Sequence, residues 1–297
     1  MMLSRREMLR RSVAVSSAVV LGQSILSPVS AADDADAALA KLGWKIGPQI
    51  YSFRLFPFDE AVKKVKECKA ASFELYGSQP ITKGSEIKIG PGLLKPENAD
   101  AFKLFKDLLA ENGVKPHSMG VCPASREYFD FAAACGFNVL NVEPKFEILP
   151  EVSKLAEEYK FYIGLHNHPK PSIYWDPDVV LAQLKDASPR IGSCADTGHW
   201  LRSGLVPVEC IRKLKGRIHS FHIKDLKKTE KGNYSGGDVP LGQGEVGIAD
   251  ILKEIATQKT AQAIPFSIEF EAHWDSNQPL IAEGIEFFKK TAKEIAG

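Results

Sequence analysis

Short apolar runs rich in β-branched and aromatic residues alternate with amphipathic helical patterns along almost the whole chain. In the segment Ala101–Gly113 the apolar residues share one helical face and Gly113 ends the helix. Asp176 followed by Pro177 marks the start of another helix. Strands are predicted between such helices at Lys45–Phe53, Ser72–Tyr76, Lys115–Val121, Val139–Glu143, Tyr162–His166, Ile191–Asp196, Ile218–Ile223 and Phe266–Glu271. Strict alternation over about 250 residues predicts an α/β fold, a single-domain (β/α)8 TIM barrel.

An open, doubly wound sheet is the alternative arrangement for alternating strands and helices. That fold usually has a Gly-rich turn after its first strand, and this chain has none there. The segments Gly77–Pro96 and Lys224–Gly247 are long for connections in a barrel, so we expect them to be active-site loops.

The N-terminus has the pattern of an export signal. A charged segment, Ser4–Arg11, precedes an apolar stretch and a small-residue exit at Ser30 and Ala31. The pair Arg5-Arg6 resembles the twin-arginine signal. We expect a signal peptide at 1–31, a loose leader at 32–42, the barrel at 43–297, and export to the periplasm. A retained N-terminal anchor is the alternative, although the apolar run is short for a bilayer.

The charge balance gives no reason to expect a nucleic-acid partner. The chain has 38 Lys+Arg and 37 Asp+Glu, and removal of the signal (four Arg and one Glu) would leave 34 basic and 36 acidic residues, a net charge of −2. The five Cys form no CxxC pair, which excludes a zinc ribbon and a disulfide framework. We expect a mature protein that binds neither nucleic acid nor a membrane, and its oligomeric state is not determined by the sequence.

Acidic residues and histidines gather at the C-terminal ends of five consecutive predicted strands. These ends read NVEPK, GLHNHP, CADTGHW, SFHIKD and SIEFEAHW. In a parallel barrel they meet at one mouth, where ionised carboxylates would repel each other without a compensating cation. A mixed set of Asp, Glu and His suits Zn²⁺, Mn²⁺ or Co²⁺ better than Ca²⁺. The sequence therefore predicts one divalent metal ion at the mouth.

The motifs IGLHNHP, CADTGHW, SFHIKD, VPLGQGEV and SIEFE together resemble the xylose isomerase-like TIM barrels, the sugar phosphate isomerase/epimerase family. The resemblance extends over Lys45–Ala296. It implies that Asp196, His222 and Glu269 bind the metal, and that His199 and Lys224 contact substrate hydroxyls. The family's usual strand-five Glu is His166 in this chain. We expect Glu143 to replace it as the fourth ligand, with His166 as a further ligand or as a base.

The expected chemistry is enediolate formation. A metal that chelates a hydroxyl and the neighbouring carbonyl stabilises the enediolate left when the α-proton departs. A base within hydrogen-bond reach must take that proton, and the candidates are His166, His168 and Glu269. Reprotonation of the enediolate gives isomerisation or epimerisation, whereas loss of a β-leaving group gives elimination.

Aromatic residues near the strand ends favour a carbohydrate ligand. Trp200 and Trp274 follow strands six and eight, and aromatic faces stack on sugar rings. We expect substrate contacts from five residues: Lys145, His199, Trp200, Lys224 and Trp274. The Gly-rich segment Leu241–Gly247 is weak evidence for phosphate binding, so we expect an unphosphorylated sugar or keto-sugar.

Three functions fit these observations. The first is a metal-dependent sugar isomerase or epimerase. The second is a metal-dependent lyase that cleaves 3-keto-glycosides by β-elimination, favoured by His166 in place of the usual Glu and by the export signal. The third is an exported, non-catalytic sugar-binding barrel.

Overall fold

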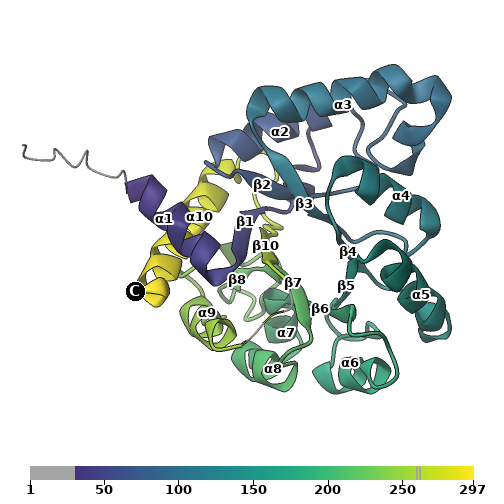
Figure 1. Cartoon of the computed structure of the whole chain (residues 1–297). Coiled ribbons are helices and arrows are strands. Elements are labelled where there is room, and N and C mark those ends of the chain that lie inside the picture. Colours follow the sequence, from purple (N-terminus) through teal and green to yellow (C-terminus); the bar gives the residue numbers. More distant parts are fainter. Residues whose placement is uncertain (1–30, 259, 261) are drawn as a thin grey trace, which may run out of the picture.

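The computed structural model describes residues 31–258, 260 and 262–297, and it contains a barrel of eight parallel strands (Figure 1). The strands are β1 (Trp44–Pro48), β2 (Ser72–Leu75), β3 (Lys115–Met119), β4 (Val139–Val142), β5 (Tyr162–His166), β6 (Ile191–Asp196), β7 (Ile218–Ile223) and β10 (Ile264–Ile268). Their spatial order is β1-β10-β7-β6-β5-β4-β3-β2. A single bridge between Gln49 and Glu74 joins the two ends, so the barrel is nearly closed. The predicted (β/α)8 fold is confirmed.

Helices surround the strands and cover the outside of the barrel (Figure 1). They are α2 (Phe58–Glu67), α3 (Ala99–Asn112), α4 (Arg126–Cys135), α5 (Leu149–Tyr159), α6 (Pro177–Leu184), α7 (Thr197–Arg202), α8 (Pro207–Lys213), α9 (Ile248–Ala256) and α10 (Gln278–Ala296). Short 3-10 helices lie at Ile50–Phe53, Pro91–Leu94, Pro96–Asn98 and Phe146–Ile148. The predicted end signals are confirmed, because Gly113 ends α3 with φ 66° and the Asp176 side chain accepts from the N–H of Asp178 at the start of α6.

Five strands have bounds that differ from the prediction: β2, β3 and β4 end one or two residues earlier, and the first and last strands differ more. The first strand ends at Pro48 because Ile50–Phe53 turns into a 3-10 helix, which the Gln49 side chain begins by accepting a 2.6 Å hydrogen bond from the N–H of Tyr51. The last strand ends at Ile268, so Glu269 and Glu271 lie in the connection that follows it.

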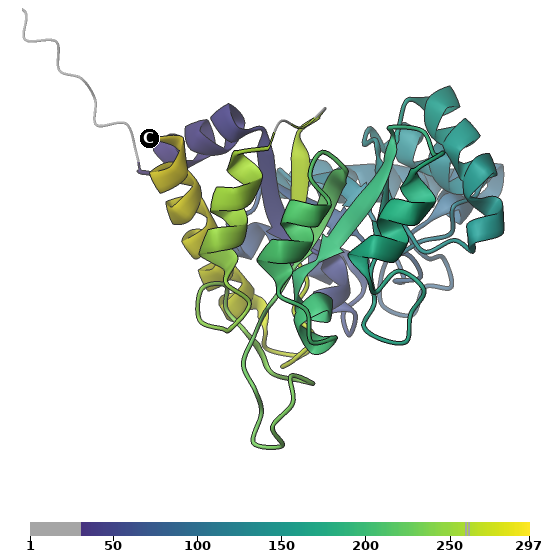
Figure 2. The ribbon, with the colours of Figure 1, turned by 90° about the horizontal axis from the view of Figure 1, so that it is seen from below.

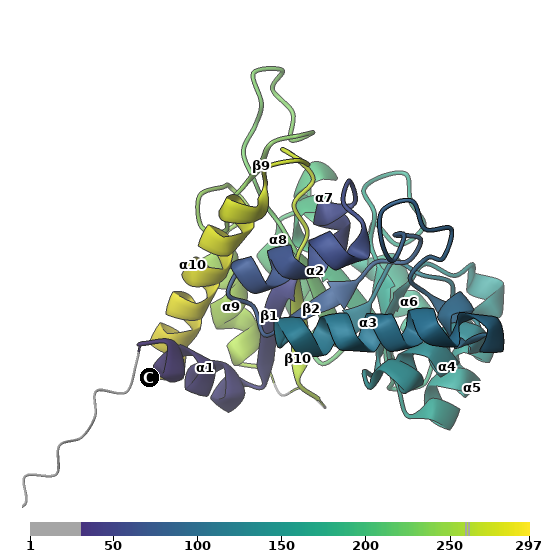
Figure 3. The ribbon, with the colours of Figure 1, turned by 90° about the horizontal axis from the view of Figure 1, so that it is seen from above.

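The segment expected to be a loose leader is helical instead. Residues Ala31–Leu42 form α1, which lies alongside α10 (Figures 1 and 3). Ala35, Ala38 and Leu39 are buried, and Lys289 pairs with Asp36 over 2.9 Å. The prediction was wrong because the small apolar residues of this Ala-rich segment recur at helical spacing and can pack closely on another helix. The predicted signal peptide lies outside the described residues, apart from Ala31.

The barrel interior is filled by side chains and leaves no room for a larger residue at Gly164 on β5. A Cβ atom there would lie 2.5 Å from Oδ1 of Asn141 and 2.6 Å from Oγ of Ser220. Both distances are shorter than a van der Waals contact, so this position requires glycine.

A long loop projects beyond the mouth of the barrel between β8 (Asp225–Leu226) and β9 (Asp238–Val239), which pair antiparallel (Figures 2 and 3). The Asp225 carboxylate holds its base by accepting hydrogen bonds from the N–H groups of Leu226, Gly242, Gly244 and Val246. Three of these N–H groups belong to the Gly-rich segment Leu241–Gly247, which thus directs them at an aspartate of its own chain. No helix in the described part of the chain is both long and apolar enough to cross a membrane.

Candidate metal centre

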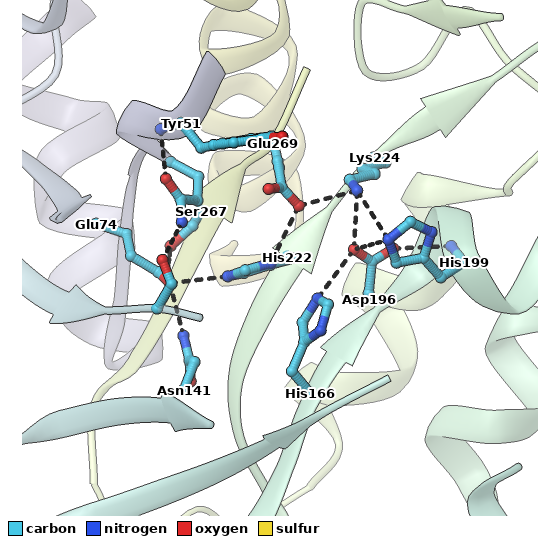
Figure 4. Close-up of polar contacts among 12 residues, drawn as sticks. Tyr51, Glu74, Asn141, His166, Asp196, His199, His222, Lys224, Ser267 and Glu269 are labelled. Atoms are coloured by element: carbon cyan, nitrogen blue, oxygen red, sulfur yellow. Dashed lines mark hydrogen bonds and ion pairs between the residues drawn. The ribbon is translucent and has the colours of Figure 1, made fainter. Parts of the chain in front are cut away.

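Four side chains from consecutive parts of the barrel meet at its mouth (Figure 4). His166 is the last residue of β5, Asp196 the last of β6, His222 lies on β7, and Glu269 follows β10. Each offers one ligand atom, and these four atoms lie within 4.8 Å of one another. All four residues are buried, Glu269 the least, with 8% of its surface exposed. This cluster could hold a metal ion.

Three atoms of the cluster lack hydrogen-bond partners within the described structure. They are Nε2 of His166, Oδ2 of Asp196 and Nδ1 of His222. Nε2 of His166 lies 3.4 Å from Oδ2 of Asp196, and Nδ1 of His222 lies 3.2 Å from Oε2 of Glu269. Buried polar atoms without partners are costly, about 1–3 kcal/mol each. Two imidazole nitrogens and two carboxylate oxygens form a donor set that suits Zn²⁺, Mn²⁺ or Co²⁺, so these residues fit the predicted ion.

Buried carboxylates orient the two histidines. Nε2 of His222 donates to Oε1 of Glu74 over 2.8 Å, and Nδ1 of His166 donates to Oε1 of Glu143 over 2.7 Å. Each bond places a proton on one ring nitrogen and turns the other nitrogen toward the cluster, where it can bind a metal ion through its lone pair when the ring is neutral. Carboxylate–histidine pairs of this kind commonly hold metal ligands in orientation.

Glu143, which we expected among the metal ligands, lies outside the four-residue cluster. It belongs to a second group with His166 and His168, and it accepts hydrogen bonds from Nδ1 of both rings. Burial raises the pKa of Glu143, but the hydrogen bonds from the two histidines outweigh burial and lower it to about 2. His166 itself reaches the cluster, so Glu143 supports that ring from the side.

Backbone contacts leave one oxygen of Asp196 free for the cluster. Its Oδ1 accepts a 2.8 Å hydrogen bond from the N–H of His199 and thereby caps α7. The Asn167 side chain bonds both the N–H and the C=O of Asp196. Burial raises the pKa of Asp196, but the Lys224 ammonium and the neighbouring His166 lower it well below its usual range, so the residue is a carboxylate.

Lys224 is buried beside the cluster. Its Nζ lies 3.1 Å from Oδ2 of Asp196, 2.8 Å from Oε2 of Glu269 and 3.0 Å from Oε2 of Glu271 (Figure 4 shows the first two). Burial lowers the pKa of Lys224, but the surrounding carboxylates outweigh burial and raise it, so the ammonium stays charged. Lys224 and Arg202 face six carboxylates in this network: Glu74, Glu143, Asp196, Asp238, Glu269 and Glu271. The excess negative charge also acts on the two histidines, because burial lowers the pKa of His166 and His222 but these carboxylates outweigh burial and raise it.

The remaining predicted site residues differ in exposure. His168 is half exposed at the mouth, with its ring 4.6 Å from that of His166. His199 is buried, and burial together with the positive charge of Lys224 lowers its pKa to about 2 although Asp196 acts to raise it. Trp274 is partly exposed and lies under the guanidinium of Arg54.

The structure gives no support for substrate contacts from two of the predicted residues, Trp200 and Lys145. Trp200 is only 1% exposed, so its ring offers no open face for stacking. Lys145 is exposed, and no hydrogen bond or ion pair links its side chain to the cluster within the described residues. The position of a residue after a strand predicts at which end of the barrel the residue lies. It does not predict the direction or the burial of its side chain.

Glu74 and Arg202 are site residues that the sequence analysis missed. Glu74 is fully buried inside the barrel and accepts from His222, Asn141, Ser118 and Ser267. Its signal was available, since Ser72 and Glu74 alternate with Phe73 and Leu75 on β2 and so share the inner face. Arg202, which pairs with Glu271 and Asp238, is at the end of α7 and has no comparable local signal.

Comparison with known proteins agrees with this architecture. Residues 146–291, which include all four cluster residues, match the protein-family model described as Xylose isomerase-like TIM barrel. The search of curated protein sequences gave no significant match.

Three solved structures illustrate the similarity. An uncharacterized protein from Parabacteroides distasonis is 27% identical, with 84% of this chain and 99% of that chain covered and a TM-score of 0.63. A xylose isomerase-like TIM barrel protein from Mycobacterium smegmatis, in complex with magnesium, is 15% identical (86% and 99% covered, TM-score 0.68). An L-ribulose 3-epimerase is 14% identical (85% and 95% covered, TM-score 0.61). This chain therefore has the same barrel fold as these three proteins.

Proposed function

We propose that this protein is a divalent-metal-dependent isomerase or epimerase that acts through an enediolate on an unphosphorylated sugar or keto-sugar. The observation that carries the proposal is the convergence of ligand atoms from His166, Asp196 and His222, none of which makes a hydrogen bond in the described structure, beside Glu269. The similarity to an L-ribulose 3-epimerase supports this class of reaction, and the similarity to a barrel in complex with magnesium supports a bound divalent ion.

The bound ion would supply electrophilic stabilisation of the oxygen on which charge develops as the α-proton leaves. His166, Asp196, His222 and Glu269 would hold it. Three carboxylates take up the three ammonium hydrogens of buried Lys224, so this side chain would act as a fixed positive charge beside the reacting group and would not bond the substrate directly. A fixed ammonium needs little rearrangement when negative charge appears, which is the main advantage of a prearranged site.

His168 is the best-placed base. Its Nδ1 donates to Glu143, which leaves the lone pair on Nε2, and the ring is half exposed at the mouth. Both nitrogens of His166 are committed, one to Glu143 and one to the cluster. His168 would therefore take the α-proton, and Glu143 would stabilise the imidazolium that forms. Glu269 is the remaining candidate for returning a proton.

Solvent exchange tests the proposal directly. The metal-loaded protein is incubated in D2O with a panel of free ketoses and 3-keto-glycosides, and deuterium at the carbon next to the carbonyl is followed by NMR. We expect deuterium incorporation together with an isomer or epimer of the substrate, and loss of both after chelation. A protein that holds its metal yet exchanges no proton across the panel would contradict the proposal and favour a non-catalytic sugar-binding barrel.

A lyase that cleaves 3-keto-glycosides is the second candidate. A histidine, His166, takes the place of the usual strand-five carboxylate in the cluster, so a relay between two Glu residues on opposite faces of the sugar carbon is lost. The same enediolate would then expel a β-substituent. Release of the aglycone in the D2O experiment, in place of an epimer, identifies this reaction.

We further propose export through the twin-arginine pathway, based on Arg5-Arg6 and the apolar stretch that follows them. The test compares the native chain with an Arg5→Lys, Arg6→Lys variant by fractionation and N-terminal sequencing. We expect a periplasmic chain cleaved near Ala31 only for the native sequence. Equal cytoplasmic retention of both chains would contradict export.

A further inference from the structure

A cavity of about 730 Å³ lies at the barrel mouth next to the candidate metal centre. Its walls come from the end of α7, from the tip of the β8–β9 loop at 232–236, and from the segment after β10 that carries Glu271 and Trp274. Glu271 links the cavity to the centre, because its Oε2 lies 3.0 Å from Nζ of Lys224, which in turn contacts Asp196 and Glu269. A ligand in the cavity would therefore lie beside a sugar at the centre.

The lining combines aromatic surface with polar groups. Tyr234 on the projecting loop and Trp274 after β10 both line the cavity. The guanidinium of Arg54 lies 3.7 Å from the centre of the Trp274 ring and occupies one of its faces, so a ligand can stack only on the opposite face. Aromatic faces next to hydrogen-bonding groups are the usual lining of sites for neutral, ring-shaped ligands such as sugars.

The charges of the lining exclude a preference for phosphate. Arg202 and Glu271 are the only charged side chains among the described lining residues, and they pair with each other over 2.5 Å. Arg202 also pairs with Asp238 over 3.0 Å. An anion would thus meet no uncompensated cation. The uncharged polar residues Asn233 and Ser235 also line the cavity and can hydrogen-bond a hydroxyl group.

We propose that this cavity is a subsite for an uncharged second sugar ring, joined to the sugar that binds at the metal centre. The inference rests on the proposed sugar chemistry and narrows its substrate to a disaccharide or glycoside. The volume supports this size, because cavities of roughly 300–1,000 Å³ bury ligands well above a single small ring.

Ligand-observed NMR with metal-loaded protein tests the subsite without requiring turnover. The probes are glucose, cellobiose, maltose, lactose and glucose 6-phosphate. We expect at least one disaccharide to bind about tenfold more tightly than glucose, with no gain for glucose 6-phosphate. Trp274→Ala should remove that tenfold preference, which corresponds to about 1.4 kcal/mol. The matched control is Trp175→Ala, a tryptophan covered by Lys170 away from the cavity, which should change binding less than twofold.

Tyr234→Ala provides a second variant on the projecting loop in case Trp274→Ala does not fold. The subsite is overturned if no disaccharide binds better than glucose, if the phosphate binds best, or if Trp274→Ala and Tyr234→Ala weaken glucose as much as the disaccharides. Failure of the reaction is a separate result. If the disaccharide preference depends on Trp274 but no proton exchange occurs in D2O, the subsite stands and the proposed chemistry is wrong.

Discussion

Glu74 accepts a 2.8 Å hydrogen bond from Nε2 of His222, deep inside the barrel, and thereby leaves Nδ1 of the same ring facing the cluster. The carboxylate is fully buried and receives three further hydrogen bonds, from Ser118, Asn141 and Ser267. Burial raises the pKa of Glu74, but His222 and these donors lower it below its usual value, so the group is an anion. The interior of the barrel thus holds a negative charge that determines how a histidine is presented at the mouth.

Removing this charge should weaken metal binding. Glu74→Gln keeps an oxygen that can accept from His222 but makes the ring a poorer donor to a cation. We expect roughly a 10- to 100-fold loss of affinity for Mn²⁺ or Zn²⁺, the usual effect of changing such an orienting partner. Titration calorimetry measures it, with the exposed Glu97→Gln as control. An unchanged affinity in a folded Glu74→Gln protein would show that Glu74 has only a structural role.

The cluster residues themselves should be essential for metal retention. Asp196→Asn and His222→Ala each remove a ligand atom, so we expect bound metal and activity to disappear together. Asn is also a good helix cap, and α7 should therefore survive in Asp196→Asn.

Asp176→Asn is the matched control, because Asp176 also caps a helix but lies outside the cluster. Elemental analysis of the purified proteins gives the metal content. Full occupancy in both cluster variants would mean that the ion binds elsewhere.

His168 should matter for proton transfer rather than for metal binding. We expect His168→Ala to lower kcat by roughly 10²–10⁴, the range typical of a lost general base, while the metal content stays at the native level. His273→Ala, another exposed histidine after β10, is the control and should retain kcat. If His168→Ala retains the native kcat, His168 is not the base and Glu269 becomes the candidate for that role.

The Asp225 carboxylate should hold the projecting loop in place. Asp225→Asn replaces one acceptor oxygen by an N–H2 group, which would face backbone donors such as the N–H of Gly242 and Gly244. A Cβ on Gly244 would lie 2.1 Å from Oδ1 of Asp225, so the two residues fit only as they are. We expect severalfold faster trypsin cleavage at Lys227, Lys228 or Lys231. The control Asp250→Asn, at the exposed start of α9, should be cleaved by trypsin at the native rate. Equal cleavage rates for the two variants would contradict the role of Asp225 in holding the loop.

The fold could be predicted from the sequence because the spacing of apolar residues within each segment indicates which face of that strand or helix is buried. This information lies in neighbouring residues of the chain. Three of the four cluster residues followed from their places at strand ends and from the family resemblance. For the fourth the sequence left His166 open as a further ligand or a base and favoured Glu143, since the two lie at neighbouring strand ends and only packing decides which of them reaches the centre. The contact of Glu74 with His222 joins residues 148 positions apart, a distance over which local patterns carry no information.

His219 should make stability depend on pH at the opposite end of the barrel. It is buried, and Nε2 donates a 3.0 Å hydrogen bond to the carbonyl of Pro189. Burial lowers its pKa from 6.5 to about 4, although hydrogen bonds to backbone carbonyls act to raise it. Between these values the unfolded chain binds a proton that the native protein does not, so stability falls as pH falls from about 6.5 to about 4 and changes no further below that. The full effect is about 3 kcal/mol.

His219→Gln keeps an N–H donor for Pro189 but cannot titrate, so it isolates this contribution. Denaturant unfolding of both proteins at pH 7.5 and pH 4.5 gives the difference in the free energy of unfolding. Carboxylates titrate in both proteins, and their contributions cancel in the comparison. We expect the native protein to lose roughly 2–3 kcal/mol more than His219→Gln between the two pH values. Equal losses in the two proteins would mean that His219 is protonated in the native state at pH 4.5 and that its burial carries no such penalty.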